Sequence, residues 1–127
     1  MDPIKVFVYK NLHKNKFSIK ALEGEHKHRV IAHRNEVFLI DASPKVSESG
    51  RQRVLSKRQK NVHAGIIGLW SDEMFELPKG PEIAYNPYEN ESFVFKEDGN
   101  HTFINSSKLY MYTDEQQTIL LTNSLTL

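Results

Sequence analysis

Apolar and polar residues alternate along the first 46 positions, and valine and aromatic residues are frequent among the apolar ones. A period of two is typical of strands that bury one face. Polar segments at 11–16 and 23–28 interrupt the pattern and predict turns. The alternation predicts strands at 4–10, 17–22, 29–33 and 36–42, and a short edge strand at 45–46. Four or five strands at this spacing are typical of a small antiparallel sheet or barrel.

The alternation stops at residues 47–60, which read SESGRQRVLSKRQK. Ser47 or Ser49 can cap the start of a helix, and good helix formers follow. Only Val54 and Leu55 are apolar in this segment. It therefore predicts one short helix that is mostly solvated and has a narrow apolar contact.

Strand-like patterns return after the helix. Residues 61–70 predict a buried strand, in which Gly65 and Gly68 indicate bulges or a close approach of another backbone. The segment 71–82 contains two prolines and a glycine and predicts a loop. Further strands are predicted at 83–88, 92–96, 101–105, 108–113 and 118–127.

The spacing of aromatic residues suggests an internal duplication. Tyr9 and Phe17 are eight positions apart, and so are Tyr85 and Phe93. Each unit has the order hairpin, turn, hairpin. Two unrelated antiparallel meanders would share many of these features, so both interpretations stay open.

These patterns together predict a mainly β (α+β) protein. We expect two related small antiparallel sheets or barrels, packed as one compact globular body and joined by one short basic helix, because a lone unit of this size buries too little apolar area to fold. The first β unit is expected at 1–46 and the second at 83–127. The basic helix, the buried strand and the loop at 47–82 would form the connector.

Charge is distributed very unevenly along the chain. Residues 1–70 carry 14 Lys and Arg against 6 Asp and Glu, a net +8. Residues 71–127 carry 3 against 10, a net −7, so the overall charge is only +1. Either the two halves attract each other, or the basic half faces an anionic partner. A third reading is that the charges simply sit on solvated surfaces.

Composition excludes several classes of protein. The chain has no cysteine, which removes disulfides, zinc thiolate sites and cysteine nucleophiles. No stretch approaches the roughly 18 apolar residues of a membrane span, and the N-terminus does not resemble a secretory signal. We therefore expect a cytoplasmic protein without a membrane partner.

Motifs of known catalytic chemistry are absent from the sequence. It has no nucleophile elbow, no Walker-type phosphate loop and no Rossmann fingerprint. The histidines stand at spacings that do not suit a metal site. We expect no cofactor and no metal, and a binding protein rather than an enzyme. A metal-free nuclease with His63 as the base would need a second acid–base group that the sequence does not reveal.

The helical segment is the best candidate for a binding surface. Five cations fall within ten positions: Arg51, Arg53, Lys57, Arg58 and Lys60. Like charges this close on a helix repel each other by a few tenths of a kcal/mol per pair, approximately, and a bound anion would relieve the repulsion. Phosphates fit, because the planar guanidinium of arginine binds them through paired hydrogen bonds. An acidic protein surface and a plain solvated face are the alternatives.

Residues next to the cations could add to such a site. Asn61 and His63 follow the cations directly, and His63 could present its imidazole to a ligand. A lone strand histidine is also commonly a structural residue. Tyr85 and Tyr88 flank Asn-Pro, which favours a turn. They could also stack on a base.

Two segments carry a resemblance to a known family. They are Gly-Arg-x-Arg-Val followed by Lys-Asn-Val-His-Ala, here 50–54 and 60–64, and Tyr-Asn-Pro-Tyr, here 85–88. With them the chain resembles a family of small proteins encoded by tailed bacteriophages. The resemblance covers most of residues 4–110. It implies an accessory role in an infected bacterium, such as host takeover, evasion of defence or handling of nucleic acid, and it implies no reaction.

Two classes of partner follow for this binding protein. The first is nucleic acid or a phosphate-bearing nucleotide, held by the basic helix. The second is an acidic bacterial host or defence protein, which the chain would occlude as an anti-defence inhibitor does, for example an anti-CRISPR-like protein. If phage-encoded, it would act in the cytoplasm of the host bacterium. A homodimer that pairs the +8 half of one copy with the −7 half of another is a further hypothesis.

Overall fold

The computed structural model describes residues 2–58, 62–114 and 117–123, and in these ranges it contains nine strands and one α-helix. The elements are β1 (Ile4–Lys10), β2 (Phe17–Ala21), β3 (Val30–Arg34), β4 (Glu36–Val46), α1 (Glu48–Lys57), β5 (Ala64–Trp70), β6 (Glu82–Ala84), β7 (Val94–Phe95), β8 (Ser106–Asp114) and β9 (Gln117–Thr122). The prediction of a mainly β protein with one short helix is confirmed.

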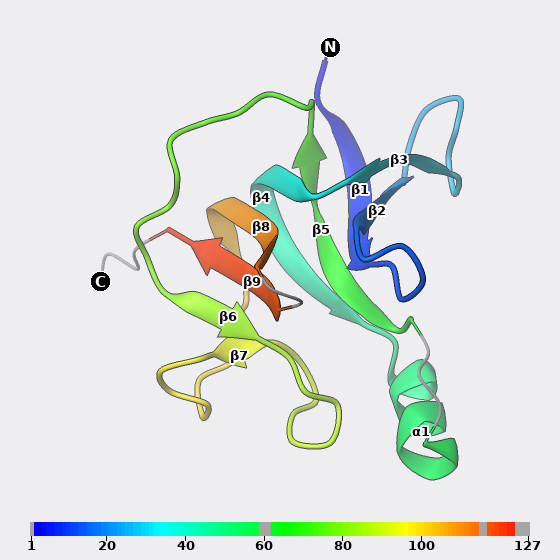
Figure 1. Cartoon of the computed structure of the whole chain (residues 1–127), viewed down its shortest axis with the longest axis vertical. Helices are drawn as coiled ribbons and strands as arrows, with labels where there is room; N and C mark the ends of the chain where they lie inside the picture. Colours follow the sequence, from blue (N-terminus) through cyan, green and yellow to red (C-terminus); the bar gives the residue numbers. More distant parts are fainter. Residues whose placement is uncertain (1, 59–61, 115–116, 124–127) are drawn as a thin grey trace.

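The strands form one sheet, in the order β3-β2-β1-β5-β4-β8-β9-β6-β7, and every pairing is antiparallel. This differs from the expected two separate sheets or barrels. The long strand β4 joins the halves, because it pairs with β5 on one side and with β8 on the other. The sheet is curled but is not closed into a barrel (Figure 1).

Two details of the expected connectivity are corrected. The strand after the helix, β5, does not link two units; it is inserted between β1 and β4. The predicted strand at 101–105 is reduced to a single bridge between Thr102 and Val94. The first expected hairpin of each unit is present, as β1–β2 and β6–β7, but among the described residues the second is not, because β3 does not pair with β4 and the 101–105 segment does not pair with β8. The order of strands outward from the β4–β8 pair is the same in both halves, as an internal repeat would give.

The core is continuous across both halves of the chain. It contains Val8 and Ile66 from the first half and Leu109, Phe103 and Ile83 from the second, each almost completely buried. Burying a side chain of this size stabilises the fold by roughly 1.5–3 kcal/mol. A core shared in this way explains why neither half needs its own closed sheet.

Close backbone approach at β5 is confirmed. A Cβ atom at Gly65 would collide with the carbonyl oxygen of Val8 and would lie 2.7 Å from the ring of Phe7. A Cβ atom at Gly68 would lie 3.1 Å from the carbonyl oxygen of Ile40. Glycine at position 65 therefore lets β5 pack tightly against its neighbours.

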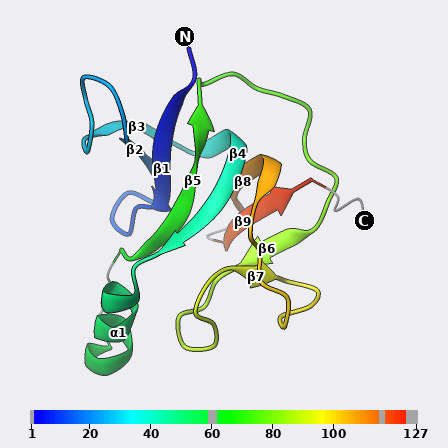
Figure 2. The same cartoon turned by 180° about the vertical axis from the view of Figure 1, so that it is seen from behind.

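The helix α1 projects beyond the end of the sheet, where it connects β4 to β5 (Figures 1 and 2). In the described ranges, no helix combines the length and the apolar character that crossing a bilayer requires.

Candidate functional site

The local sequence explains where α1 begins and ends. The Ser47 side chain accepts a hydrogen bond from the backbone N–H of Gly50 at 3.2 Å, which is the usual N-cap contact. The helix ends at Arg58, which has the left-handed φ of 53° and donates its N–H to the carbonyl of Val54 at 2.9 Å. The prediction of a capped, mostly solvated helix is confirmed, since only Gly50 and Val54 are buried in it.

One cation of the predicted binding set is used inside the molecule. The side chain of Arg51 is 11% exposed. Its Nε donates to the carbonyl oxygens of Pro87 and Asn90, both at 3.1 Å, and its Nη1 pairs with Glu48 at 3.2 Å. A hydrogen bond from Gln52, and then the charge and hydrogen bond of Arg51, lower the pKa of Glu48. Arg51 thus fastens α1 to the 86–90 turn, which faces the helix in Figures 1 and 2.

The other described cations of the helix face outward, and we call Arg53, Lys57 and Arg58 the basic tip. All three are exposed. Arg53 and Lys57 are four residues apart and so lie on the same side of the helix. Within the described residues, no carboxylate lies at ion-pair distance from any of the three. Lys60 and Asn61 lie outside the described residues.

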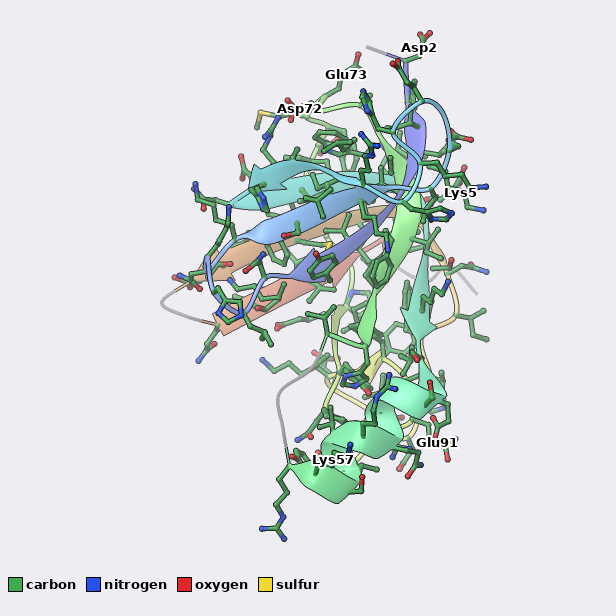
Figure 3. All side chains as sticks on the ribbon, turned by 90° about the vertical axis from the view of Figure 1, so that its right-hand side faces the viewer. Asp2, Lys5, Lys57, Asp72, Glu73 and Glu91 are labelled. Carbon is green, nitrogen blue, oxygen red and sulfur yellow. The ribbon has the colours of Figure 1, made fainter. Side chains whose placement is uncertain are left out.

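The basic tip lies far from much of the acidic charge. Figure 3 shows Lys57 and Glu91 at one end of the molecule and Asp72 and Glu73 at the other. Among the described residues, the one ion pair between the +8 half and the −7 half is Arg34 with Asp72, at 3.2 Å. Direct ion pairs between the two halves are therefore rare among the described residues.

A groove of about 250 Å³ adjoins the start of α1. We call it the basic groove; it is lined by Phe7, Lys20, Leu22, His28, Lys45, Ser47, Val62 and His63. No acidic residue is among its described lining residues, and neither Lys20 nor Lys45 makes an ion pair with a described carboxylate. Its lysines and its apolar floor could hold an anion that carries a ring.

Sequence reasoning missed Lys20 and Lys45, because they are 25 positions apart and come from different strands. The sheet order β2-β1-β5-β4 brings them to one face, where Lys20 lies opposite Phe7 and Lys45 lies opposite Gly65. A partial signal existed, since the alternation in β2 placed Lys20 on the side away from Ile19 and Ala21.

The structure brings His63 and Tyr85 together. Their Nε2 and hydroxyl atoms are hydrogen-bonded at 2.7 Å, and Tyr85 also packs on Phe93 with ring centroids 5.1 Å apart. Burial raises the pKa of Tyr85. This pair joins the start of β5 to the end of β6, so both residues have a structural role here.

The Tyr-Asn-Pro-Tyr segment forms the expected turn. The side-chain oxygen of Asn86 accepts the N–H of Tyr88 at 3.0 Å, and the carbonyl of Asn86 accepts the N–H of Asn90 at 2.9 Å. Tyr88 is 60% exposed, unlike Tyr85. Of the two predicted stacking residues, Tyr88 is therefore the one whose ring faces solvent.

The described part of the chain contains no group of three or more His, Asp or Glu that could hold a metal ion.

Comparisons with known proteins point to a phage family. A family model described as Mycobacterium phage L5 gene 82 protein matches residues 1–119. The gene 82 protein of Mycobacterium phage L5 is 41% identical over 115 residues, which cover 86% of this chain and 90% of that protein. No solved structure matches the chain. The resemblance to a family of small phage proteins is confirmed.

Proposed function

Because the chain belongs to the family of the Mycobacterium phage L5 gene 82 protein, we propose that it is a phage accessory protein that binds nucleic acid in the cytoplasm of the infected bacterium. It binds without catalysing a reaction. The basic tip and the basic groove form the contact surface, and phosphates are the groups that they hold.

The observation that carries this proposal is that no described carboxylate lies at ion-pair distance from the basic tip. Arg53 and Lys57 are like charges at i and i+4, which repel each other by a few tenths of a kcal/mol, approximately. No described carboxylate relieves the repulsion. The phosphates of a nucleic acid strand would relieve it and would release condensed counterions.

The basic groove extends this surface toward the sheet. Lys20 and Lys45 add two further positive charges, and Phe7 offers an aromatic surface at the groove floor. Grooves that combine cations with aromatic rings favour single strands, whose bases are free to stack. We therefore expect single-stranded DNA or RNA to bind more tightly than duplex DNA.

The test is the salt dependence of binding. Fluorescence anisotropy with a labelled single strand is measured between about 50 and 200 mM salt, where each neutralised phosphate contributes about −0.7 to the slope of log K against log salt. The variant with Arg53→Gln, Lys57→Gln and Arg58→Gln should bind at least tenfold more weakly at low salt. Its slope should be shallower by about two, at roughly 0.7 per lost contact.

A matched control removes the same charge from the acidic half. The variant with Lys79→Gln, Lys96→Gln and Lys108→Gln should bind like the wild type, apart from a small change in net charge. Equal weakening in both triple variants, or no binding by the wild type at 50 mM salt, would show that the basic tip is not a nucleic-acid site.

One observation favours the second candidate, an anti-defence inhibitor that occludes an acidic host protein. Val62 in the basic groove is 41% exposed, and an exposed apolar side chain beside cations suits a protein surface. Pull-down from bacterial lysate with and without nuclease separates the two candidates. A host protein that is retained after nuclease treatment by the wild type, but not by the Arg53, Lys57 and Arg58 variant, supports the inhibitor.

A further inference from the structure

A second cavity lies on the opposite, core-facing side of the sheet. It has a volume of about 260 Å³ and lies between β1 and β5 on one side and β6, β8 and β9 on the other. We call it the seam cavity, because β1 and β5 do not pair with β6 or β9. It is partly open to solvent, so it is a pocket that a small molecule can enter.

Two lining residues form hydrogen bonds across this seam. The Lys10 Nζ atom at the end of β1 donates to the hydroxyl of Thr113 in β8 at 2.6 Å. The hydroxyl of Tyr85 is bonded to His63 at 2.7 Å. Side chains thus join the two sides of the sheet where backbone pairing does not, and they leave the cavity between them.

The lining is apolar and aromatic except for one charge. Phe17, Ile66, Phe93, Met111 and Leu120 supply most of the apolar surface. Among the described residues, Lys10 is the one charged residue of the lining, and its Nζ lies 5.2 Å from the centroid of the Phe17 ring.

The ammonium of Lys10 still has donors to offer. It has three N–H groups, and Thr113 accepts one of them. No described carboxylate pairs with Lys10. Partial burial lowers the pKa of this amine, because it disfavours the charged form. An anion in the cavity would supply that partner.

We infer that the seam cavity binds a small aromatic carboxylate, with its ring among Phe17, Phe93 and Met111 and its carboxylate on Lys10. The volume limits the size of the ligand. About 260 Å³ lies below the usual range for pockets that bind drug-sized ligands, and it suits one ring with a short chain. The aromatic lining favours a ring over a flexible chain. We place the opening beside Thr118, because it is an exposed lining residue near the start of β9.

The experiment compares 3-phenylpropionate with 3-phenylpropanol, which has nearly the same shape but no charge. Both are titrated into the ¹⁵N-labelled protein and followed by NMR. We expect shifts that are confined to the lining residues of the seam cavity, and an affinity for the carboxylate at least tenfold higher than for the alcohol.

Three variants complete the test. Lys10→Met should reduce the affinity for the carboxylate to that of the alcohol, whereas Lys5→Met, a matched change at an exposed position of the same strand, should leave the preference intact. Thr118→Trp should block entry of both compounds. Because Thr118 is exposed, this variant keeps the inference testable even where Lys10→Met fails to fold.

The inference is overturned by shifts outside the cavity, by equal affinities for the two compounds, or by wild-type behaviour of Thr118→Trp. Failure here is distinguishable from failure of nucleic-acid binding. The Arg53, Lys57 and Arg58 variant should still bind 3-phenylpropionate, since the basic tip does not line the seam cavity.

Discussion

Arg51 and Arg53 are two positions apart in one helix and serve different purposes. Arg51 faces the same side as Gly50 and Val54, and its guanidinium reaches the carbonyls of the 86–90 turn. Arg53 faces solvent. The sequence identified the cluster of cations, but it did not separate the structural Arg51 from the exposed Arg53. That separation depends on which side of the helix packs against the 86–90 turn. The binding surface that we propose therefore does not include Arg51.

Replacing Arg51 tests its structural role. Arg51→Met keeps most of the apolar stem but removes the donors to Pro87 and Asn90, so we expect a loss of about 1–3 kcal/mol in the free energy of unfolding. Amide exchange at 86–90 should speed up selectively. In the control, Arg53→Met should change stability by no more than about 0.5 kcal/mol. Equal effects of both substitutions in urea unfolding would contradict the role assigned to Arg51.

Tyr110 predicts a dependence of stability on alkaline pH. Burial, and then the hydrogen bond to Glu36 at 2.6 Å, raise the pKa of its hydroxyl. Because the unfolded chain releases this proton near its ordinary pKa of about 10, the stabilisation is complete below that pH and is lost as pH rises further.

Urea unfolding at pH 8 and pH 11 measures this effect. The wild type should lose more stability than Tyr110→Phe between these values. The comparison isolates Tyr110, because the two proteins differ only in this hydroxyl. Equal losses of stability in the two proteins would show that folding does not raise the pKa of this hydroxyl.

At the scale of elements, α1 is the segment whose structure the sequence predicted best. The serine cap, the helix formers and the scarcity of apolar residues all agree, and helix formation depends mainly on such local features. The strands with clear alternation, β1 and β2, were also located well. The predicted strand at 101–105 was wrong. Its residues alternate like a strand, but the segment pairs with a neighbouring strand only through the single bridge between Thr102 and Val94.

The N-cap of α1 is open to a direct test. Ser47→Ala removes the acceptor for the N–H of Gly50 and should cost about 0.5–2 kcal/mol in the free energy of unfolding, whereas Ser47→Asp should retain most of the stability. Ser56→Ala is the control, because this exposed serine lies in the last turn of the same helix. Circular dichroism with urea unfolding measures all three; an equal loss in Ser47→Ala and Ser56→Ala would mean that the cap contributes little.

At the scale of the whole molecule, the uneven charge becomes a spatial arrangement. The sequence showed a +8 half and a −7 half, but not whether they neutralise each other. The fold joins the halves in one sheet through β4 and β8, yet Arg34 with Asp72 is the one described ion pair between them. The projecting helix keeps the basic tip away from Asp72 and Glu73 (Figure 3).

The sequence by itself determined the mainly β class, the single capped helix and the basic segment, because alternation, capping and charge density are local properties of the chain. Only the tertiary structure decided that β4 and β8 pair in one sheet, that Lys20 and Lys45 share a groove, and that Arg51 faces inward while Arg53 does not. Those outcomes depend on contacts between residues far apart in the chain. Burial of a shared core selects such contacts, and a local pattern does not record them.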